Sequence, residues 1–237
     1  MSEHEPLPPG QVELAEFPRF GLGKFANRFP KSPVFEALGV GGDVAQEIRV
    51  TEALSALPRI EQQSDFHCVT TWSVLGLVWS GYRFGDFYER IVVAQAQPLA
   101  GAEFVVFRGE DDYCSSLPLS DLLADDVLLA DRLNGADLGI AHGAPLRLIA
   151  PAHYGFKNPK HLVAIEFWRD ARNYRFPQPY PNLMDHPRGR VAAEERGRWV
   201  PTLVLRYLYR LIVPFTIRAF KRALDRKRRK GDGGIIF

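Results

Sequence analysis

The chain has 237 residues, 46% of them hydrophobic and 24% charged, a composition typical of a soluble globular protein with one complete core. Its two cysteines, Cys68 and Cys114, do not suggest a disulfide-stabilised secreted scaffold, so we expect free thiols. The net charge of +2 is unevenly spread, because ten Lys and Arg but only two Asp and Glu follow residue 198. This basic end predicts contact with something anionic, and we expect no nucleic-acid partner.

The N-terminal segment divides into two parts. Residues 1–16 are rich in Pro and Glu and are expected to form a loose arm. Residues 17–30 then alternate aromatic side chains with glycine and cations, without a clean helical or strand period. This second part is either an irregular arm that packs its phenylalanines, or a segment that lies over an anionic cofactor with Asn27 and Arg28 among its contacts.

The next residues predict short elements. Residues 47–50 are typical of a strand, and Thr51 is a suitable N-cap for a helix over 52–57 that Pro58 ends. Cys68 follows between His67 and a small polar turn. A lone cysteine is usually a small buried hydrophobe, but this polar context also suits a nucleophile or a soft metal ligand. His67 is interpreted as a loop histidine bonded to backbone, or as a group that orients the thiolate.

Further along, short apolar runs alternate with turn signals. A helix is predicted to begin at Gly85 and Asp86, and the pair Asn134–Gly135 is a strong hairpin signal. Strands are predicted over 103–107, 127–130, 145–150 and 162–168. Many short strands with few long helices indicate an α+β fold dominated by mixed sheet, and the sequence contains no phosphate-binding glycine fingerprint.

Residues 142–160 concentrate positive charge. Arg147 lies within an otherwise apolar run and therefore needs a partner, and Lys157 and Lys160 follow in a glycine-containing turn. One interpretation is a solvated hairpin. The other is a clamp in which these three cations hold a phosphate or a planar, anionic group.

The last 39 residues, 199–237, are predicted to form a basic, amphipathic helical tail, separate from a larger domain over 1–198. Trp199, Leu203, Tyr207, Leu211 and Phe215 recur every four residues, and Pro214 is expected to kink the helix. The helix either packs on its own domain, or lies on an anionic membrane or a membrane redox partner. The sequence shows no export signal or membrane span, so we expect a cytoplasmic protein, with peripheral association at the inner face as an option.

Three blocks resemble one known family. Residues 66–73 with 78–81, residues 142–160, and residues 185–196 are similar, in this order, to motifs of the sulfite oxidase-like molybdopterin-dependent oxidoreductases, nearest the protein-methionine-sulfoxide reductases. The resemblance implies a sulfite oxidase-type fold of mixed sheets with short helices, a molybdenum-molybdopterin cofactor, and Cys68 as the protein ligand to molybdenum. Thr70 and Thr71 stand where the reductase pattern has Glu-Ala, and where sulfite oxidases have an Arg-rich stretch that holds sulfite.

The candidate cofactor-binding residues follow partly from this resemblance. Eight positions are assigned to the pterin and its phosphate: His67, His142, Arg147, Gly155, Lys157, Asn158, Pro159 and Lys160. Asn27 and Arg28 of the N-terminal segment are added to this set. The implied activity is oxygen-atom transfer, with reduction of an S-oxide or N-oxide favoured and a small molecule or a sulfoxide as substrate. A cofactor-free relative that acts as a membrane-associated binding protein is the main alternative, and a cysteine hydrolase is a weaker one.

Overall fold

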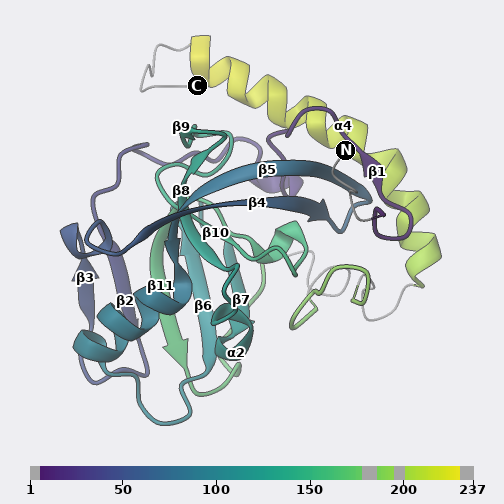
Figure 1. The fold of residues 1–237 in the computed structure, drawn as a ribbon. Helices are drawn as coiled ribbons and strands as arrows, with labels where there is room; N and C mark the ends of the chain where they lie inside the picture. Colours follow the sequence, from purple (N-terminus) through teal and green to yellow (C-terminus); the bar gives the residue numbers. More distant parts are fainter. Residues whose placement is uncertain (1–5, 178–185, 195–200, 230–237) are drawn as a thin grey trace.

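The computed structural model describes residues 6–177, 186–194 and 201–229. Within them the chain forms two mixed sheets with few helices (Figure 1). The first sheet has the order β1-β5-β8-β10, with β4 paired to β5 and β9 to β8. Its strands are β1 (Val12–Glu13), β4 (Arg59–Cys68), β5 (Trp72–Arg83), β8 (Leu128–Leu133), β9 (Ala136–Asp137) and β10 (Arg147–Ile149).

The second sheet has the order β3-β2-β11-β6-β7. Its strands are β2 (Leu38–Gly42), β3 (Ile48–Val50), β6 (Phe104–Gly109), β7 (Cys114–Pro118) and β11 (Leu162–Trp168). β11 pairs parallel with β2 and antiparallel with β6, so the sheet is mixed as predicted. The predicted strands over 103–107, 127–130, 145–150 and 162–168 correspond to β6, β8, β10 and β11.

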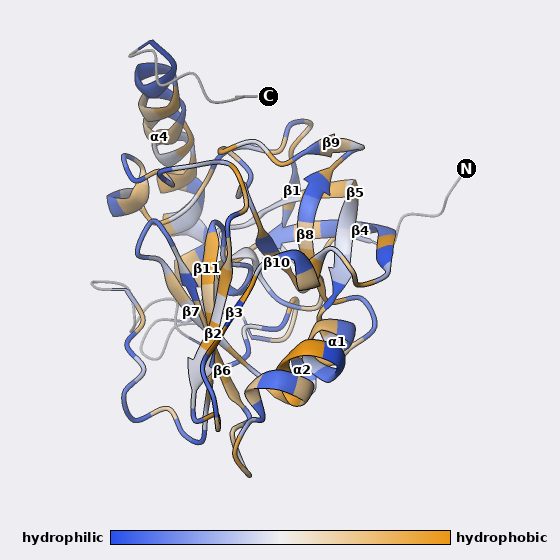
Figure 2. Ribbon diagram, turned by 90° about the vertical axis from the view of Figure 1, so that its left-hand side faces the viewer, coloured by the Kyte–Doolittle hydropathy of each residue, from blue (hydrophilic) through white to orange (hydrophobic). Residues whose placement is uncertain are grey.

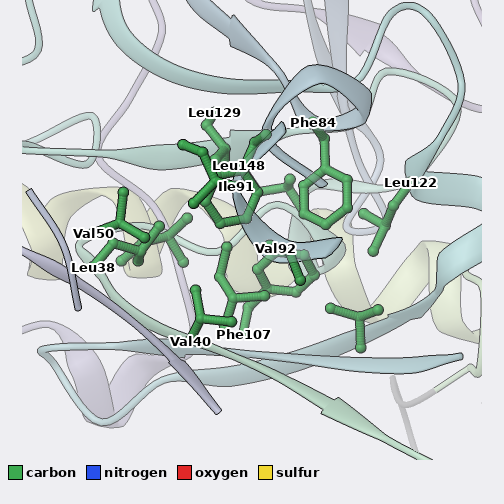
Figure 3. Close-up of a cluster of buried hydrophobic side chains, with 14 of the residues drawn as sticks. Leu38, Val40, Val50, Phe84, Ile91, Val92, Phe107, Leu122, Leu129 and Leu148 are labelled. Atoms are coloured by element: carbon green, nitrogen blue, oxygen red, sulfur yellow. The ribbon is translucent and has the colours of Figure 1, made fainter. Parts of the chain in front are cut away.

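The main apolar core lies between the sheets and the helix that connects them. α1 (Phe84–Phe87) continues directly into the helix η3 (Tyr88–Ala96), and Phe87 and Ile91, four residues apart, both face inward. Figure 3 shows this cluster, in which Phe107 of β6 and Leu148 of β10 meet the helix. The short helix α2 (Leu119–Leu122) adds Leu122 to the same core.

Two local predictions were wrong. The helix expected over 52–57 is a single turn, η2 (Glu52–Leu54), and the side chain of Thr51 makes no capping bond. The six residues 52–57 are too few to offset the cost of helix nucleation. The N-terminal arm is also not loose throughout: the amide of Val12 donates to Thr71 and that of Leu14 to Ser73, which fixes β1 beside β5.

The chain ends in α4 (Thr202–Arg229), which continues through Pro214 as one helix. α4 runs across the outside of the first sheet, next to β1 (Figure 1). No helix among the described residues is both long and apolar enough to cross a bilayer. The expected boundary after residue 198, Trp199, and the Glu195–Arg196 part of the third motif lie outside the described residues.

Two small turns, η1 (Gly23–Phe25) and η4 (Gly155–Lys157), pack near α4. Phe25, Tyr154, Phe156 and Phe220 form part of a third apolar cluster that joins the N-terminal arm, η4 and α4. Three segments distant in sequence are therefore held together beside the end of β4, where Cys68 lies.

Candidate functional site

A cavity of about 370 Å³ lies where the end of β4, the N-terminal arm, the η4 turn and α4 meet. Its volume is within the range of about 300–1,000 Å³ that is usual for small-molecule and cofactor sites. Cys68, Arg19, Lys160, Asp111 and Tyr209 are among the residues that line it. A thiol, two cations and a carboxyl group thus line the same pocket.

Cys68 is the last residue of β4, and a tight turn follows it. The amide of Thr71, whose φ is +74°, donates back to the carbonyl of Cys68 at 3.0 Å. The thiol is buried, and its Sγ lies 3.1 Å from Oγ1 of Thr70. Burial raises the pKa of Cys68 to about 11, although the Thr70 bonds and the charge of Lys160 act in the opposite direction. Without a bound cation this side chain is a protonated thiol.

Lys160 lines the same cavity, and its Nζ donates to the carbonyls of Phe20 at 3.1 Å and Ala141 at 3.3 Å. Burial, followed by the charges of Arg147 and Arg19, lowers the pKa of Lys160 to about 7. A bound anion would favour the charged form of this lysine.

The turn that carries Lys160 is fixed by Asn158 and Gly155. The side-chain oxygen of Asn158 accepts from the amide of Ala150 at 2.6 Å, and its Nδ2 donates to the carbonyl of His153 at 3.1 Å. A Cβ on Gly155 would lie 2.6 Å from the ring of Phe66, so only glycine fits there. Asn158, Pro159 and Gly155 line the cavity, and the bonds of Asn158 set the direction in which the turn leaves β10.

Arg147 and Lys157 are fully buried but do not line the cavity. Arg147 donates through Nη1 to the carbonyl of His142 at 2.7 Å, and its guanidinium lies 4.9 Å from the ring centre of Trp79. Burial lowers the pKa of Arg147 to about 9. Lys157 donates to the carbonyl of Ser116 at 2.9 Å. These two cations support the turn from behind and add positive potential to the site.

The remaining candidates lie outside the cavity lining. His67 Nδ1 is 2.8 Å from Oγ of Ser73, and the ring of His142 stacks on Phe17 at 4.9 Å. Arg28 pairs with Asp112 at 2.7 Å on the surface, and Asn27 accepts from Arg226 of α4. Asn27 and Arg28 therefore connect the arm to other surface segments.

The cavity residues that were not among the candidates include Arg19, Trp72, Asp111 and Tyr209. The guanidinium of Arg19 donates to the carbonyls of Ala26 and Arg28. Burial raises the pKa of the Asp111 carboxyl. The alternation of aromatic and cationic residues in the arm was the available signal for Arg19, but no sequence pattern brings Tyr209 next to Cys68.

Two of these residues leave polar atoms unused. Nε1 of Trp72 and the hydroxyl of Tyr209 are buried and have no hydrogen-bond partner among the described residues. Buried donors normally find a partner, and both of these donors belong to residues that line the cavity. One soft sulfur, two cations and two free donors suit a metal held by an anionic, oxygen-rich organic chelator, and the residues present therefore fit a molybdopterin.

Curated relatives include two oxidoreductases. YuiH of Bacillus subtilis (strain 168), an uncharacterised oxidoreductase, is 40% identical over 119 residues, covering 50% of this chain and 58% of YuiH. YedZ1 of Azospira oryzae, a putative protein-methionine-sulfoxide reductase subunit, is 34% identical over 114 residues, covering 48% of this chain and 41% of YedZ1. The matched part of the chain thus spans about half the length of these relatives.

A solved structure supports the fold. The crystal structure of the sulfane dehydrogenase SoxCD from Paracoccus pantotrophus matches with a TM-score of 0.51 at 20% identity, covering 68% of this chain and 45% of that one. This likeness agrees with the predicted α+β architecture of mixed sheets and short helices. Residues 31–175 match the family described as the oxidoreductase molybdopterin binding domain, which is more than half of the chain. The chain therefore belongs to this family of molybdopterin-binding oxidoreductases.

Proposed function

We propose that this chain binds a molybdenum-molybdopterin cofactor and catalyses oxygen-atom transfer, with Cys68 as the protein ligand to the metal. The observation that carries the proposal is the shared cavity: the thiol of Cys68 and the cations Lys160 and Arg19 line the same 370 Å³ space. A thiolate is a soft ligand that suits molybdenum already bound by sulfur. Metal binding would also offset the burial that keeps this thiol protonated.

The same proposal assigns the pterin and its phosphate to the cationic side of the cavity. Lys160 and Arg19 would face the anionic groups, with Gly155, Asn158 and Pro159 forming the wall beside them. Arg147 and Lys157 would contribute charge from the second layer, and His142 would hold the N-terminal arm through its stack on Phe17. His67, Asn27 and Arg28 stay in the proposed set as residues that position the Cys68 loop and the arm.

Reduction of an S-oxide is the favoured reaction. The sulfur–oxygen bond breaks, two electrons and two protons are taken up, and the products are a sulfide and water. The bound cofactor would supply the two-electron change, and the protein's share is to bind and orient the substrate. The free donors of Trp72 and Tyr209 suit the oxygen of an S-oxide or N-oxide. The name of YedZ1, a protein-methionine-sulfoxide reductase subunit, supports the choice of a sulfoxide.

The electrons must come from outside the chain. We place the contact with a redox partner, or with the inner face of a membrane, on the basic helix α4, which forms one wall of the cavity through Tyr209 and Phe220. A donor that binds there would lie close to the metal site. The description of YedZ1 as a subunit supports the need for a second component.

Metal analysis of the purified protein tests this proposal. Protein produced in a host that makes the cofactor should contain close to one molybdenum per chain and should reduce a sulfoxide or an N-oxide with a chemical electron donor. Cys68→Ser should lower turnover more than roughly 100-fold, because loss of a metal ligand exceeds the effect of losing an outer contact. Cys114→Ser, which changes the other cysteine of the chain, is the matched control and should leave turnover unchanged.

Two results would contradict the proposal. Unchanged turnover in Cys68→Ser would remove this sulfur from the mechanism. A purified protein without molybdenum or pterin, from a host that loads other molybdopterin enzymes, would favour the alternative of a cofactor-free binding protein.

A further inference from the structure

α4 turns a continuous apolar stripe toward solvent. The side chains of Leu203, Tyr207, Leu211 and Phe215 are each 68–70% exposed, and they recur every four residues along one side of the helix. Val204, Leu208 and Ile212, which are 46–53% exposed, widen the stripe. Exposed apolar residues are common singly, but a contiguous patch of this kind marks an interaction surface.

The orientation of the helix is fixed by its other side. Leu205, Tyr209, Phe220 and Ala223 are buried, and Phe220 stacks on Phe20 of the N-terminal arm with ring centres 6.3 Å apart. At 100° per residue these four positions lie on one side and the exposed stripe on the other. α4 therefore has two apolar sides, and only one of them packs against the rest of the domain.

The exposed side of α4 changes from apolar to basic along its length. After Phe215, the exposed residues Arg218, Lys221, Arg222 and Arg229 lie on the same side as the stripe, by the same helical spacing. None of these four makes an ion pair within the part of the chain that the structure describes. Figure 2 shows the hydrophilic last turns of the helix in blue, at the end nearest the C-terminus.

We infer that α4 docks on an anionic lipid surface, with its apolar half inserted among the acyl chains and its basic half on the headgroups. A helix with an apolar stripe and adjoining cations, held parallel to the surface of its domain, has the form of an interfacial helix. The cations match the negative potential of anionic lipids, and a lipid surface accepts the protruding side chains without a preformed complementary pocket. The proposed function puts a contact with a redox partner or a membrane on α4, and this inference selects the membrane. It rests on that assignment to α4 and not on the metal site.

Vesicle co-sedimentation with the full chain tests the inference. The protein should bind vesicles of phosphatidylcholine with one-third phosphatidylglycerol, bind pure phosphatidylcholine at least tenfold more weakly, and lose affinity as salt is raised. The variant Leu211→Gln with Phe215→Gln should weaken binding at least tenfold. The matched control, Val93→Gln with Leu99→Gln, changes exposed apolar residues away from α4 and should bind as the wild type does.

The basic half is tested in the same assay. Arg218→Gln, Lys221→Gln and Arg222→Gln together should weaken binding by about fivefold for each charge removed. Arg49→Gln with Arg83→Gln, exposed cations on other elements, should have little effect. Circular dichroism of each variant should show an unchanged helix content, so that a loss of binding reports the surface and not the fold.

Three outcomes would overturn the inference. They are absence of vesicle binding, equal binding to anionic and uncharged vesicles, and a stripe-dependent dimer, which would assign the stripe to a second copy of the chain. The cofactor-free protein and Cys68→Ser should bind vesicles as the wild type does. A failed molybdenum analysis therefore leaves this inference standing, and failed vesicle binding leaves the metal site standing.

Discussion

The core between the two sheets and the interior beside the cavity contain different kinds of side chain. The core between the sheets, around Phe84, Phe107 and Leu148, consists of apolar side chains (Figure 3). The interior beside the cavity instead buries Arg19, Arg147 and Lys157, and it also holds the half-buried Lys160. Burying apolar area favours folding, whereas burying a charge opposes it. The apolar core therefore stabilises the fold, and its stability offsets the cost of burying charge beside the cavity.

The hydrogen-bond partners of Arg147 and Lys160 leave the positive charge beside the cavity largely uncompensated. Arg147 and Lys160 donate mainly to backbone carbonyls, which satisfy hydrogen bonds without cancelling the charge. Asp111 is the carboxyl whose charge acts on Lys160, and burial raises the pKa of Asp111. The cavity side is thus left with excess positive charge, which an anionic ligand would complement.

The largest expected effect lies in the apolar core. Phe107→Ala should lower the free energy of unfolding by about 3–5 kcal/mol, because the ring is fully buried and its loss leaves a cavity between the sheets. Phe20→Ala, at a half-buried residue of the cavity lining, should cost less than about 2 kcal/mol. Urea unfolding of the cofactor-free proteins measures both. Equal losses would show that the two interiors contribute alike to stability.

An intermediate effect is expected at Lys160. Lys160→Met removes a positive charge from the cavity wall, so affinity for the anionic cofactor should fall by about 10–100-fold. The cofactor-free variant should be at least as stable as the wild type, because the cost of burying the ammonium is removed. Lys31→Met, at an exposed lysine, should change neither quantity. Loss of stability without loss of cofactor would make Lys160 a structural residue.

How much of this could be read from the sequence differs between the two interiors. Alternating apolar runs predicted most strands, and the spacing of Phe87 and Ile91 predicted the inward side of α1 and η3, because these patterns report burial directly. The neighbourhood of Cys68 and Lys160, 92 positions apart, came from the family resemblance, since no local pattern encodes a contact between distant turns.

The misplaced residues show where sequence reasoning stops. The arm was expected to offer Asn27 and Arg28, yet Arg19 is the cation of the arm that lines the cavity, because β1 pairing fixes where the chain enters. The four-residue apolar repeat predicted a helix correctly at Leu203–Phe215. Such a stripe normally faces the core, whereas here it faces solvent and a second set, including Tyr209, packs inward.

A pH dependence also distinguishes the two interiors. His161 is buried beside the cavity, its Nδ1 lies 2.6 Å from the carbonyl of Ala144, and burial lowers the pKa of His161 to about 3. In the unfolded chain the pKa returns to about 6.5. Between these values the unfolded state binds one more proton, so stability is lost as the pH falls from about 6.5 towards 3, by up to about 1.4 kcal/mol per pH unit.

His161→Asn isolates this contribution in the cofactor-free protein. The asparagine amide can donate to the same carbonyl and tolerates the positive φ of 55° at this position, but it does not titrate. The free energy of unfolding of the variant should therefore fall less steeply than that of the wild type between pH 6 and pH 4, while the two curves run parallel above pH 7. Parallel curves over the whole range would mean that this histidine is solvated in the folded state. In that case the acid sensitivity of the cavity side would have to come from other groups. The apolar core contains no titrating histidine among its described residues, so the contrast between the two interiors would then rest on the buried cations alone.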